Sequence, residues 1–269
     1  MTLDISTRRA DFHALHKEGY FLLPTARDVG SARCLEKMGF AALASSNTSL
    51  AWALGRDDGH VTRDEVLTHL RRLVNATEMA VHADLGFGFA EEPAEVAANV
   101  RLAIDTGIAS LSIADLIGGE LVDLKQAARH IRAARDAISV SGADVLLVGR
   151  SEGLLAGRVS IDHTIERLVT YSKAGADVVC APGLSDPRGI KSLVKAVAPK
   201  SVDVQLMKPG VTAADLGEWG VRRISVADSF AGASWRKFER IAQHFIDYGD
   251  LSPEAVSTTS ASVLDAETF

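Results

Sequence analysis

The sequence predicts an α/β protein of the (β/α)8 TIM-barrel class, in which eight parallel strands alternate with helices. Short apolar segments typical of strands alternate with amphipathic segments typical of helices along about 250 residues. The strand segments are mostly apolar on both faces, as in a parallel sheet covered by helices. A doubly wound open sheet is the alternative, but the turn at Gly86 and Gly88 lacks the third glycine and the acidic residue of a dinucleotide-binding fingerprint. We therefore predict one barrel domain over residues 1–250 and a polar tail at 251–269, flexible or packed on a neighbouring subunit.

Strands are predicted where runs of mainly apolar residues lie between turn-forming residues. In chain order these runs are 20–24, 40–45, 80–83, 109–113, 144–148, 177–181, 201–207 and 222–226. We expect the polar residues 46–49 to form a loop after the second strand. The glycine-containing segment 116–122 is expected to form a loop after the fourth strand.

Helices are predicted where apolar residues recur at helical spacing between start and stop signals. Thr62 and Glu65 form a capping box before one such segment, and Gly175 and Gly249 are placed to end two others. A short helix over 12–17 precedes the first strand. The helices that follow the strands are 31–38, 62–76, 92–105, 124–137, 161–174, 187–198, 213–219 and 234–248.

The composition is that of an ordinary globular protein, with 269 residues, 47% hydrophobic and 24% charged. The net charge of −6 and the lack of a basic stripe argue against a nucleic-acid partner. No apolar run approaches the ~18 residues of a membrane span, and the polar N-terminus does not resemble a signal peptide. Cys34 and Cys180 lie far apart in apolar surroundings, so we expect reduced core thiols. These features together predict a cytoplasmic protein with no membrane partner.

Polar side chains follow most of the predicted strands, and in a barrel the carboxyl ends of the strands meet at one mouth. The stretch AVHADLGFGF shows this most clearly, because a buried strand ends there in Asp84 and a glycine-containing turn. Several carboxylates facing one arginine favour a hard divalent cation beside an anionic substrate. The residues expected at this mouth are Ser45, Ser46, Asn47, Asp58, Asp84, Asp115, Arg150, Ser151, Glu152 and Lys208.

Structural roles compete with functional ones at most of these positions. Asp58 and Asp115 fit loop caps as well as ligands, and Glu152 fits a simple partner for Arg150. His82 is more typical of a packing residue in a strand. An Asp84–Arg150 pair facing one mouth is harder to explain without a function, because buried charges are costly.

Five segments resemble the phosphoenolpyruvate mutase/isocitrate lyase superfamily, in order along residues 12–248. They are LLPTARDVGSARCLEKMGFAALASS, SLAWALGRDDG, VHADLGFGF, VGRSEGLL and GVRRISV. The resemblance implies a (β/α)8 barrel with Mg²⁺ at its mouth that makes or breaks a C–C or C–P bond next to an enolpyruvate unit. It also implies a homo-oligomer, a dimer or tetramer, in which the last helix, 234–248, is exchanged between subunits.

Carried over residue by residue, the resemblance implies the following site. The first acid of the family motif D-x-[DE]-x-G-[YF], which binds magnesium directly, is Asp84, and the arginine of its [NA]-x-R-[TS]-[DE] motif is Arg150. The acid of its G-x-x-D turn is Asp58. We therefore expect the catalytic residues to be Asp58, Asp84 and Arg150. The residues expected to bind the substrate are Ser46, Asn47, Thr48, Arg150 and Ser151.

The sequence departs from the family pattern in ways that bear on the metal. Gly86 replaces the second acid of the D-x-[DE]-x-G motif, and Ala114 replaces the glutamate after the fourth strand. Both acids normally hold magnesium through its waters, so the expected Mg²⁺ site is weakened. Gly118, Gly119 and Glu120 stand where isocitrate-type lyases carry the K-[KR]-C-G-H motif, so cleavage of isocitrate or methylisocitrate is not expected.

Three functions remain open on the sequence. The first is a lyase or phosphonomutase-like enzyme acting on a small α-keto or dicarboxylic acid, with the metal at Asp84. The second is a metal-independent enzyme on the same scaffold, with His82 or Lys208 as acid or base. The third is a non-catalytic relative that binds a ligand or a protein.

Overall fold

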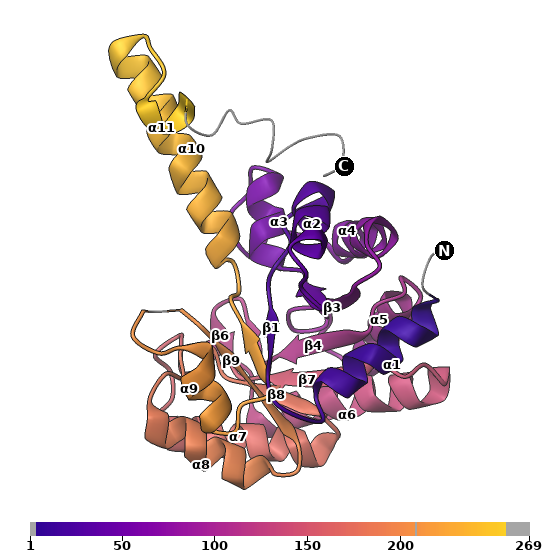
Figure 1. Cartoon of the computed structure of the whole chain (residues 1–269). Helices are drawn as coiled ribbons and strands as arrows, with labels where there is room; N and C mark the ends of the chain where they lie inside the picture. Colours follow the sequence, from indigo (N-terminus) through magenta and orange to yellow (C-terminus); the bar gives the residue numbers. More distant parts are fainter. Residues whose placement is uncertain (1–3, 208, 257–269) are drawn as a thin grey trace.

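The computed structural model describes residues 4–207 and 209–256, and its centre is a barrel of eight parallel strands (Figure 1). Each strand pairs in parallel with its neighbour in the order β1-β10-β9-β8-β7-β4-β3-β2. The strands are β1 (Phe21–Leu23), β2 (Ala42–Ala44), β3 (Ala80–Asp84), β4 (Ser110–Ala114), β7 (Leu146–Arg150), β8 (Val178–Cys180), β9 (Ser201–Gln205) and β10 (Arg223–Ser225). All eight lie within or next to the predicted runs, so the (β/α)8 prediction is confirmed.

The barrel closes between the first two strands through a few main-chain hydrogen bonds. The N–H group of Ala44 donates to the carbonyl of Pro24 at 2.8 Å, and the N–H group of Ala26 donates back to the carbonyl of Ala44 at 2.9 Å. A parallel bridge between Thr25 and Ala44 marks the same contact. The sheet therefore has no open edge at this position.

Helices surround the barrel, as Figure 1 shows, and most begin and end at the predicted signals. The capping box of Thr62 and Glu65 is present, and Gly175 and Gly249 end their helices in the left-handed conformation. The helices are α1 (Ile5–Leu15), α2 (Val29–Lys37), α3 (Asn47–Ala53), α4 (Arg63–Ala76), α5 (Pro93–Ile104), α6 (Leu124–Ser141), α7 (Ile161–Ala174), α8 (Pro187–Val197), α9 (Ala213–Glu218), α10 (Ser229–Tyr248) and α11 (Pro253–Val256).

Two local predictions were wrong. Residues 46–49 are not a loop, because Ser46 caps α3 and the helix begins at Asn47. Residues 116–122 are more ordered than a loop, since β5 (Leu116–Ile117) and β6 (Glu120–Leu121) form an antiparallel hairpin. The expected polar tail contains the helix α11, and its residues 257–269 lie outside the described ones, so this expectation stays a prediction.

The core has two layers. One lies between the sheet and the helices and contains large aliphatic side chains such as Leu111 and Leu147. The other fills the barrel, where Phe12 from α1 contacts Phe21 edge to face and packs with small residues of the strands. Helix α1 thereby closes the end of the barrel at which the strands begin.

The inner face of the barrel is more polar than the predicted two-sided apolar strands. Nε of Arg223 lies 3.1 Å from Oδ2 of Asp203, and Oγ of Ser225 donates to Oδ1 of Asp203 at 2.9 Å. Nδ1 of His82 lies 2.5 Å from Oγ of Ser110. These side chains are almost completely buried, so the polar groups contact one another inside the barrel.

Cys34 and Cys180 are both free thiols. Cys180 is buried inside the barrel, and Cys34 is half-buried on α2. Within the described part of the chain, no helix has the length and hydropathy needed to span a membrane.

Candidate active site

Asp84 and Arg150 meet at the mouth where the strands end. Asp84 is the last residue of β3 and Arg150 the last of β7, and only β4 lies between these strands. Nη2 of Arg150 donates to Oδ1 of Asp84 at 3.0 Å. The expectation that strand ends bring this pair together is thus confirmed by their geometry.

Main-chain N–H groups fix the carboxylate of Asp84 from two sides. Oδ1 accepts from the N–H group of Gly86 at 3.0 Å, and Oδ2 accepts from the N–H group of Asn47 at 3.3 Å. The N–H group of Asp84 itself donates to Oγ of Ser45 at 3.0 Å. The ends of β2 and β3 are therefore held together at the site, and the Asp84 side chain is held in one orientation.

Arg150 lies between two carboxylates. Its Nε atom is 2.7 Å from Oε1 of Glu152, and the side chains of Arg150, Asp84 and Glu152 are only 16%, 14% and 18% exposed. Burial on its own lowers the pKa of Arg150, but Asp84 and Glu152 outweigh it, so its pKa lies above the usual value. The guanidinium is therefore a permanent positive charge at the mouth.

Glu152 is a buried carboxyl group among other acids. Burial raises its pKa, Arg150 opposes the shift, and the charges of Asp84, Asp115 and Asp58 add to it. The sequence had suggested a simple partner for Arg150 at this position, and Glu152 does fill that role. Burial among other acids also holds its pKa above the usual value of a glutamate.

The segment after β2 brings Thr48 and Asp58 together. Oγ1 of Thr48 donates to Oδ1 of Asp58 at 2.9 Å, and the N–H group of Gly59 donates to the same oxygen at 2.8 Å. Oγ of Ser46 accepts from the N–H group of Ser49 at 3.1 Å as the cap of α3. The expected substrate-binding residues 46–48 thus form the start of a helix, with the Asp58 turn held against it.

Asp115 is turned away from the mouth into a buried network. Its Oδ2 accepts from Nε of Arg167 at 2.8 Å and from the hydroxyl of Tyr171 at 2.6 Å, while Oδ1 accepts from the N–H group of Glu152 at 2.8 Å. Burial, followed by the charge of Asp115, raises the pKa of Tyr171 above its usual value. Asp115 therefore attaches the segment after β7 to helix α7 and has a structural role.

The other expected site residues are placed differently. Ser151 is completely buried, its N–H group donates to the carbonyl of Cys180 at 2.9 Å, and its hydroxyl has no partner among the described residues. His82 lies inside the barrel, where burial, followed by the charges of Arg223 and Arg150, lowers its pKa far below the usual value. Lys208 lies outside the described residues.

The residues at the expected magnesium site offer few oxygen ligands. Asp84 supplies one carboxylate, whereas Gly86 and Ala114 supply no side-chain oxygen. Residues 4–207 and 209–256 contain no group of three or more His, Cys, Asp or Glu side chains that could hold a metal ion. Mg²⁺ requires a near-octahedral shell of oxygens. The side chains present thus do not fit the metal shell that the resemblance implies.

Sequence reasoning missed the partners that position the site. Arg167 and Tyr171 of α7, which hold Asp115, are separated from it by 52 and 56 positions. The pattern of α7 shows that these residues share one side of the helix with its buried face, but nothing in the sequence identifies their partner. The alternation in SVDVQ could have indicated that Asp203 lies on the same face of its strand as Gln205.

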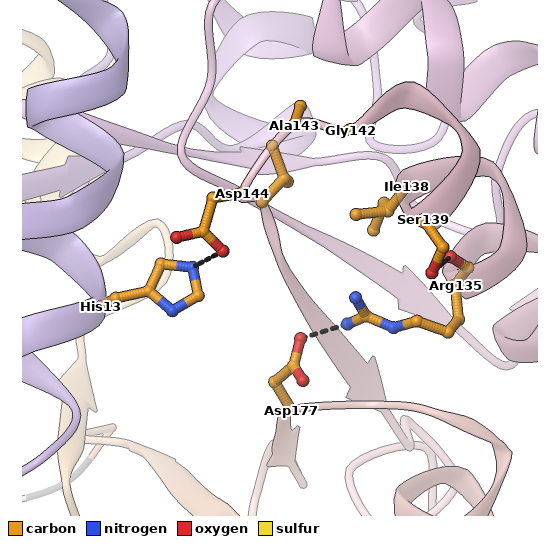
Figure 2. A pocket seen from close by; sticks show the side chains of 9 residues that line it. His13, Arg135, Ile138, Ser139, Gly142, Ala143, Asp144 and Asp177 are labelled. Atoms are coloured by element: carbon orange, nitrogen blue, oxygen red, sulfur yellow. Dashed lines mark hydrogen bonds and ion pairs between the residues drawn. The ribbon is translucent and has the colours of Figure 1, made fainter.

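A pocket lies at the opposite end of the barrel from this mouth, where β7 and β8 begin (Figure 2). Its volume is about 350 Å³, and its charged groups pair with one another. Nε2 of His13 lies 3.0 Å from Oδ1 of Asp144, and Arg135 contacts Asp177. The N–H group of Leu147 donates to the same carboxylate of Asp177 at 2.9 Å. Because residues at this end of a barrel usually serve stability, we assign the mouth as the candidate active site.

Comparisons with known proteins agree with this geometry. The family model of phosphoenolpyruvate phosphomutase matches residues 12–246. An uncharacterized protein of Mycobacterium tuberculosis H37Rv is 32% identical over 216 residues, which is 80% of each chain. The 2-methylisocitrate lyase of Escherichia coli K12 is 26% identical and spans 94% of this chain and 86% of its own.

A crystal structure from Burkholderia cenocepacia J2315, described as that of a candidate lyase/mutase, has a TM-score of 0.92 and 34% identity. The alignment covers 97% of this chain and 96% of that chain. The match of the family model over most of the chain and the conserved barrel geometry lead to one conclusion. This chain belongs to the phosphoenolpyruvate phosphomutase family, and thus to the phosphoenolpyruvate mutase/isocitrate lyase superfamily of lyases and mutases.

Proposed function

We propose that this enzyme makes or breaks a C–C or C–P bond next to an enolpyruvate unit in a small α-keto or dicarboxylic acid. The observation that carries the proposal is the buried guanidinium of Arg150, held by Asp84 and Glu152 at the mouth of the barrel. A fixed arginine suits an anionic substrate, because its planar fork matches the oxygens of a carboxylate or phosphonate.

The roles proposed for the neighbouring residues follow from their contacts. Arg150 binds an anionic end of the substrate, and Asp84 keeps the guanidinium in place through its 3.0 Å contact. Asn47 and Thr48 at the start of α3 face the substrate carboxylate, with Asp58 held beside Thr48 to assist or gate the reaction. Substrate binding by Ser46 and Ser151 stays a prediction.

Charge that develops on an enolate oxygen during bond cleavage needs a preorganised positive partner. A donor fixed before the reaction stabilises that charge without reorganisation, and a single such donor is commonly worth about 100-fold or more in rate. Arg150 meets this requirement, because its two carboxylate neighbours restrict its position and keep it protonated. Magnesium at Asp84 stays a prediction of the resemblance, and none of these roles depends on it.

The quaternary arrangement is also a proposal. Helix α10 extends from the barrel with α11 beside it, as Figure 1 shows, and Ala231 is its only buried residue. Phe238 is 62% exposed, and Ile246 and Tyr248 are also largely exposed. Large apolar side chains on one extended helix favour burial against another subunit. We therefore propose a homo-oligomer in which α10 packs on a neighbouring copy. A cytoplasmic location stays a prediction.

The test of the proposed function is a turnover screen. Purified protein is incubated with a panel of α-keto acids, 2-hydroxydicarboxylic acids and phosphonopyruvate, and products are detected by mass spectrometry and ³¹P NMR. We expect turnover of at least one member and its loss in Arg150→Ala. The exposed variant Arg132→Ala on α6 serves as the control and should retain wild-type rates. Lack of turnover across the panel would favour the non-catalytic alternative.

A further inference from the structure

The carboxylate of Asp84 is already occupied by nitrogen donors. Its two oxygens accept from Nη2 of Arg150 at 3.0 Å and from the N–H groups of Gly86 at 3.0 Å and Asn47 at 3.3 Å. A carboxylate has about four lone-pair sites, so these donors leave room for little else. A cation bound to Oδ1 would also lie close to the guanidinium and would be repelled by it.

The other carboxylates near the mouth have partners that they would have to release. Asp115 accepts from Arg167, Tyr171 and the main chain, and Asp58 accepts from Thr48 and the main chain. Glu152 lies against Arg150, and its raised pKa reflects the cost of adding negative charge there. Among the described residues, Mg²⁺ at Asp84 would therefore find no second carboxylate without breaking an existing contact, and waters or substrate would have to fill the rest of its shell.

The place of the missing acid is open and faces a hydrogen-bond donor. A Cβ atom built at Gly86 would have a single neighbour within 4 Å, Nδ2 of Asn47 at 3.5 Å. Among the described residues, the side-chain amide of Asn47 makes no hydrogen bond of its own. Its main-chain N–H group donates to Asp84, so the amide is anchored directly beside the Asp84–Arg150 pair.

We propose that this mouth binds the oxygens of a carboxylate or enolate directly, in the space beside Gly86 between the Asn47 amide and Arg150, without a divalent cation. On this proposal, the loss of the two magnesium-shell acids at Gly86 and Ala114 and the presence of the Asn47 amide belong to the same change in how the ligand is held. Oxygens that a metal would hold are instead held by nitrogen donors. The inference rests on the proposed function only for its ligand class, a small carboxylate.

The distinguishing experiment is isothermal titration calorimetry with oxalate, a planar dicarboxylate that mimics the enolate of pyruvate. Oxalate is titrated into wild-type protein in excess EDTA, and again in excess MgCl2, and MgCl2 is titrated alone. We expect oxalate to bind in EDTA with a Kd that, calculated from the free oxalate left by its own chelation of Mg²⁺, changes less than about twofold in MgCl2, a difference below about 0.4 kcal/mol. Saturable binding of Mg²⁺, or oxalate binding that requires Mg²⁺, would overturn the inference. Absence of oxalate binding under both conditions would also overturn it.

Matched variants then test the assigned donor. Asn47→Ala removes the amide but keeps the main-chain contact to Asp84, and we expect oxalate affinity in EDTA to fall about tenfold, or about 1.4 kcal/mol. Asn47→Asp should abolish metal-free binding, because it places a negative charge against the ligand.

Asn75→Ala, at an exposed position of α4, is the control and should bind like wild type. Thermal melts followed by circular dichroism check that each variant is folded. Wild-type affinity in Asn47→Ala would remove the amide from the site.

The same measurements separate this inference from the proposed function. Turnover that requires Mg²⁺, together with Mg²⁺-dependent oxalate binding, would leave the lyase or mutase reaction standing and reject metal-free binding. Metal-free oxalate binding without turnover of any panel member would reject the lyase or mutase reaction and leave metal-free binding standing.

Discussion

Nη2 of Arg150 and Oδ1 of Asp84 are 3.0 Å apart at the mouth of the barrel, although the residues lie 66 positions apart in the chain. The contact joins the ends of two strands that are separated by β4 alone. Both side chains are mostly buried, so each neutralises a charge that would otherwise be costly to desolvate. Asp84 thereby keeps the guanidinium of Arg150 in place.

Replacing Arg150 by lysine should remove most of the activity while the charge is retained. A lysine ammonium cannot donate to Asp84, contact Glu152 and bind a planar carboxylate with the same fork. We expect kcat to fall about 100-fold, as for the loss of one preorganised donor. Steady-state kinetics on the substrate found in the turnover screen provides the measurement. Arg132→Lys is the control, and equal rates for Arg150→Lys and wild type would show that the fork geometry is unimportant.

Asp115→Ala should be among the most destabilising single substitutions in this barrel. It leaves the buried guanidinium of Arg167 without its carboxylate, a change that costs about 3–5 kcal/mol. Tyr171→Phe removes one hydrogen bond of the same network and should cost about 1 kcal/mol. Urea unfolding followed by circular dichroism measures both, with the exposed Asp11→Ala as control. If Asp115→Ala were no more destabilising than Tyr171→Phe, the network would not be cooperative.

Stability should fall as the pH is lowered from 6.5 towards 4, because burial lowers the pKa values of His16 and His69 to about 4. In this window the unfolded chain binds protons that the folded chain does not, so the free energy of unfolding decreases with falling pH. Each histidine contributes a slope of up to about 1.4 kcal/mol per pH unit. The contribution of these neutral histidines to the free energy of unfolding is fully present above pH 6.5, the pKa of histidine in the unfolded chain.

The measurement is urea unfolding at several pH values for the wild type and for His69→Gln. The variant lacks one of the histidines whose pKa burial lowers, so its loss of stability between neutral and acidic pH should be smaller. His60→Gln, an exposed position on the loop before α4, is the control. Identical pH profiles for the wild type and His69→Gln would exclude His69 as a source of the dependence.

Charges placed on the outer part of α10 should dissociate the proposed oligomer. Phe245 and Ile246 are 56% and 77% exposed, so Phe245→Glu with Ile246→Glu adds charge where an interface would need apolar contacts. Size-exclusion chromatography with light scattering should give a larger mass for the wild type than for the variant. Val140→Glu is a matched control, because Val140 is 83% exposed on α6. A wild-type protein that is monomeric at assay concentrations would contradict the arrangement.

The barrel could be predicted because its strands and helices carry strong local signals. Runs such as DVLLV and the Thr62–Glu65 capping box specify an element without reference to the rest of the chain. Helix α3 was not predicted because it has only seven residues and begins with Asn47 and Thr48, which are weak helix formers. The polar inner face of the barrel was not predicted because the sequence does not show which face of β9 or β10 points into the barrel.

The candidate site was predictable as a set of strand ends but not as a network. Asp84 and Arg150 end strands, and the fold alone brings such residues to one mouth. Asp115 follows a strand in the same way, yet its carboxylate turns towards Arg167 and Tyr171 of α7. The direction of a side chain depends on long-range partners, which a single sequence does not reveal.

The side chains that fill the barrel also limit the space for a ligand next to the mouth. In register with Arg150 across β8, β9 and β10 lie Cys180, Asp203 and Arg223, and all three are almost completely buried. A reacting molecule therefore finds no free space beside these side chains inside the barrel. Any part of it that extends beyond a compact acid must point outwards, past α3 and the β5–β6 hairpin. Under the proposed function, the elements outside the barrel limit the length of the substrate, and Arg150 at the end of β7 binds its charged end.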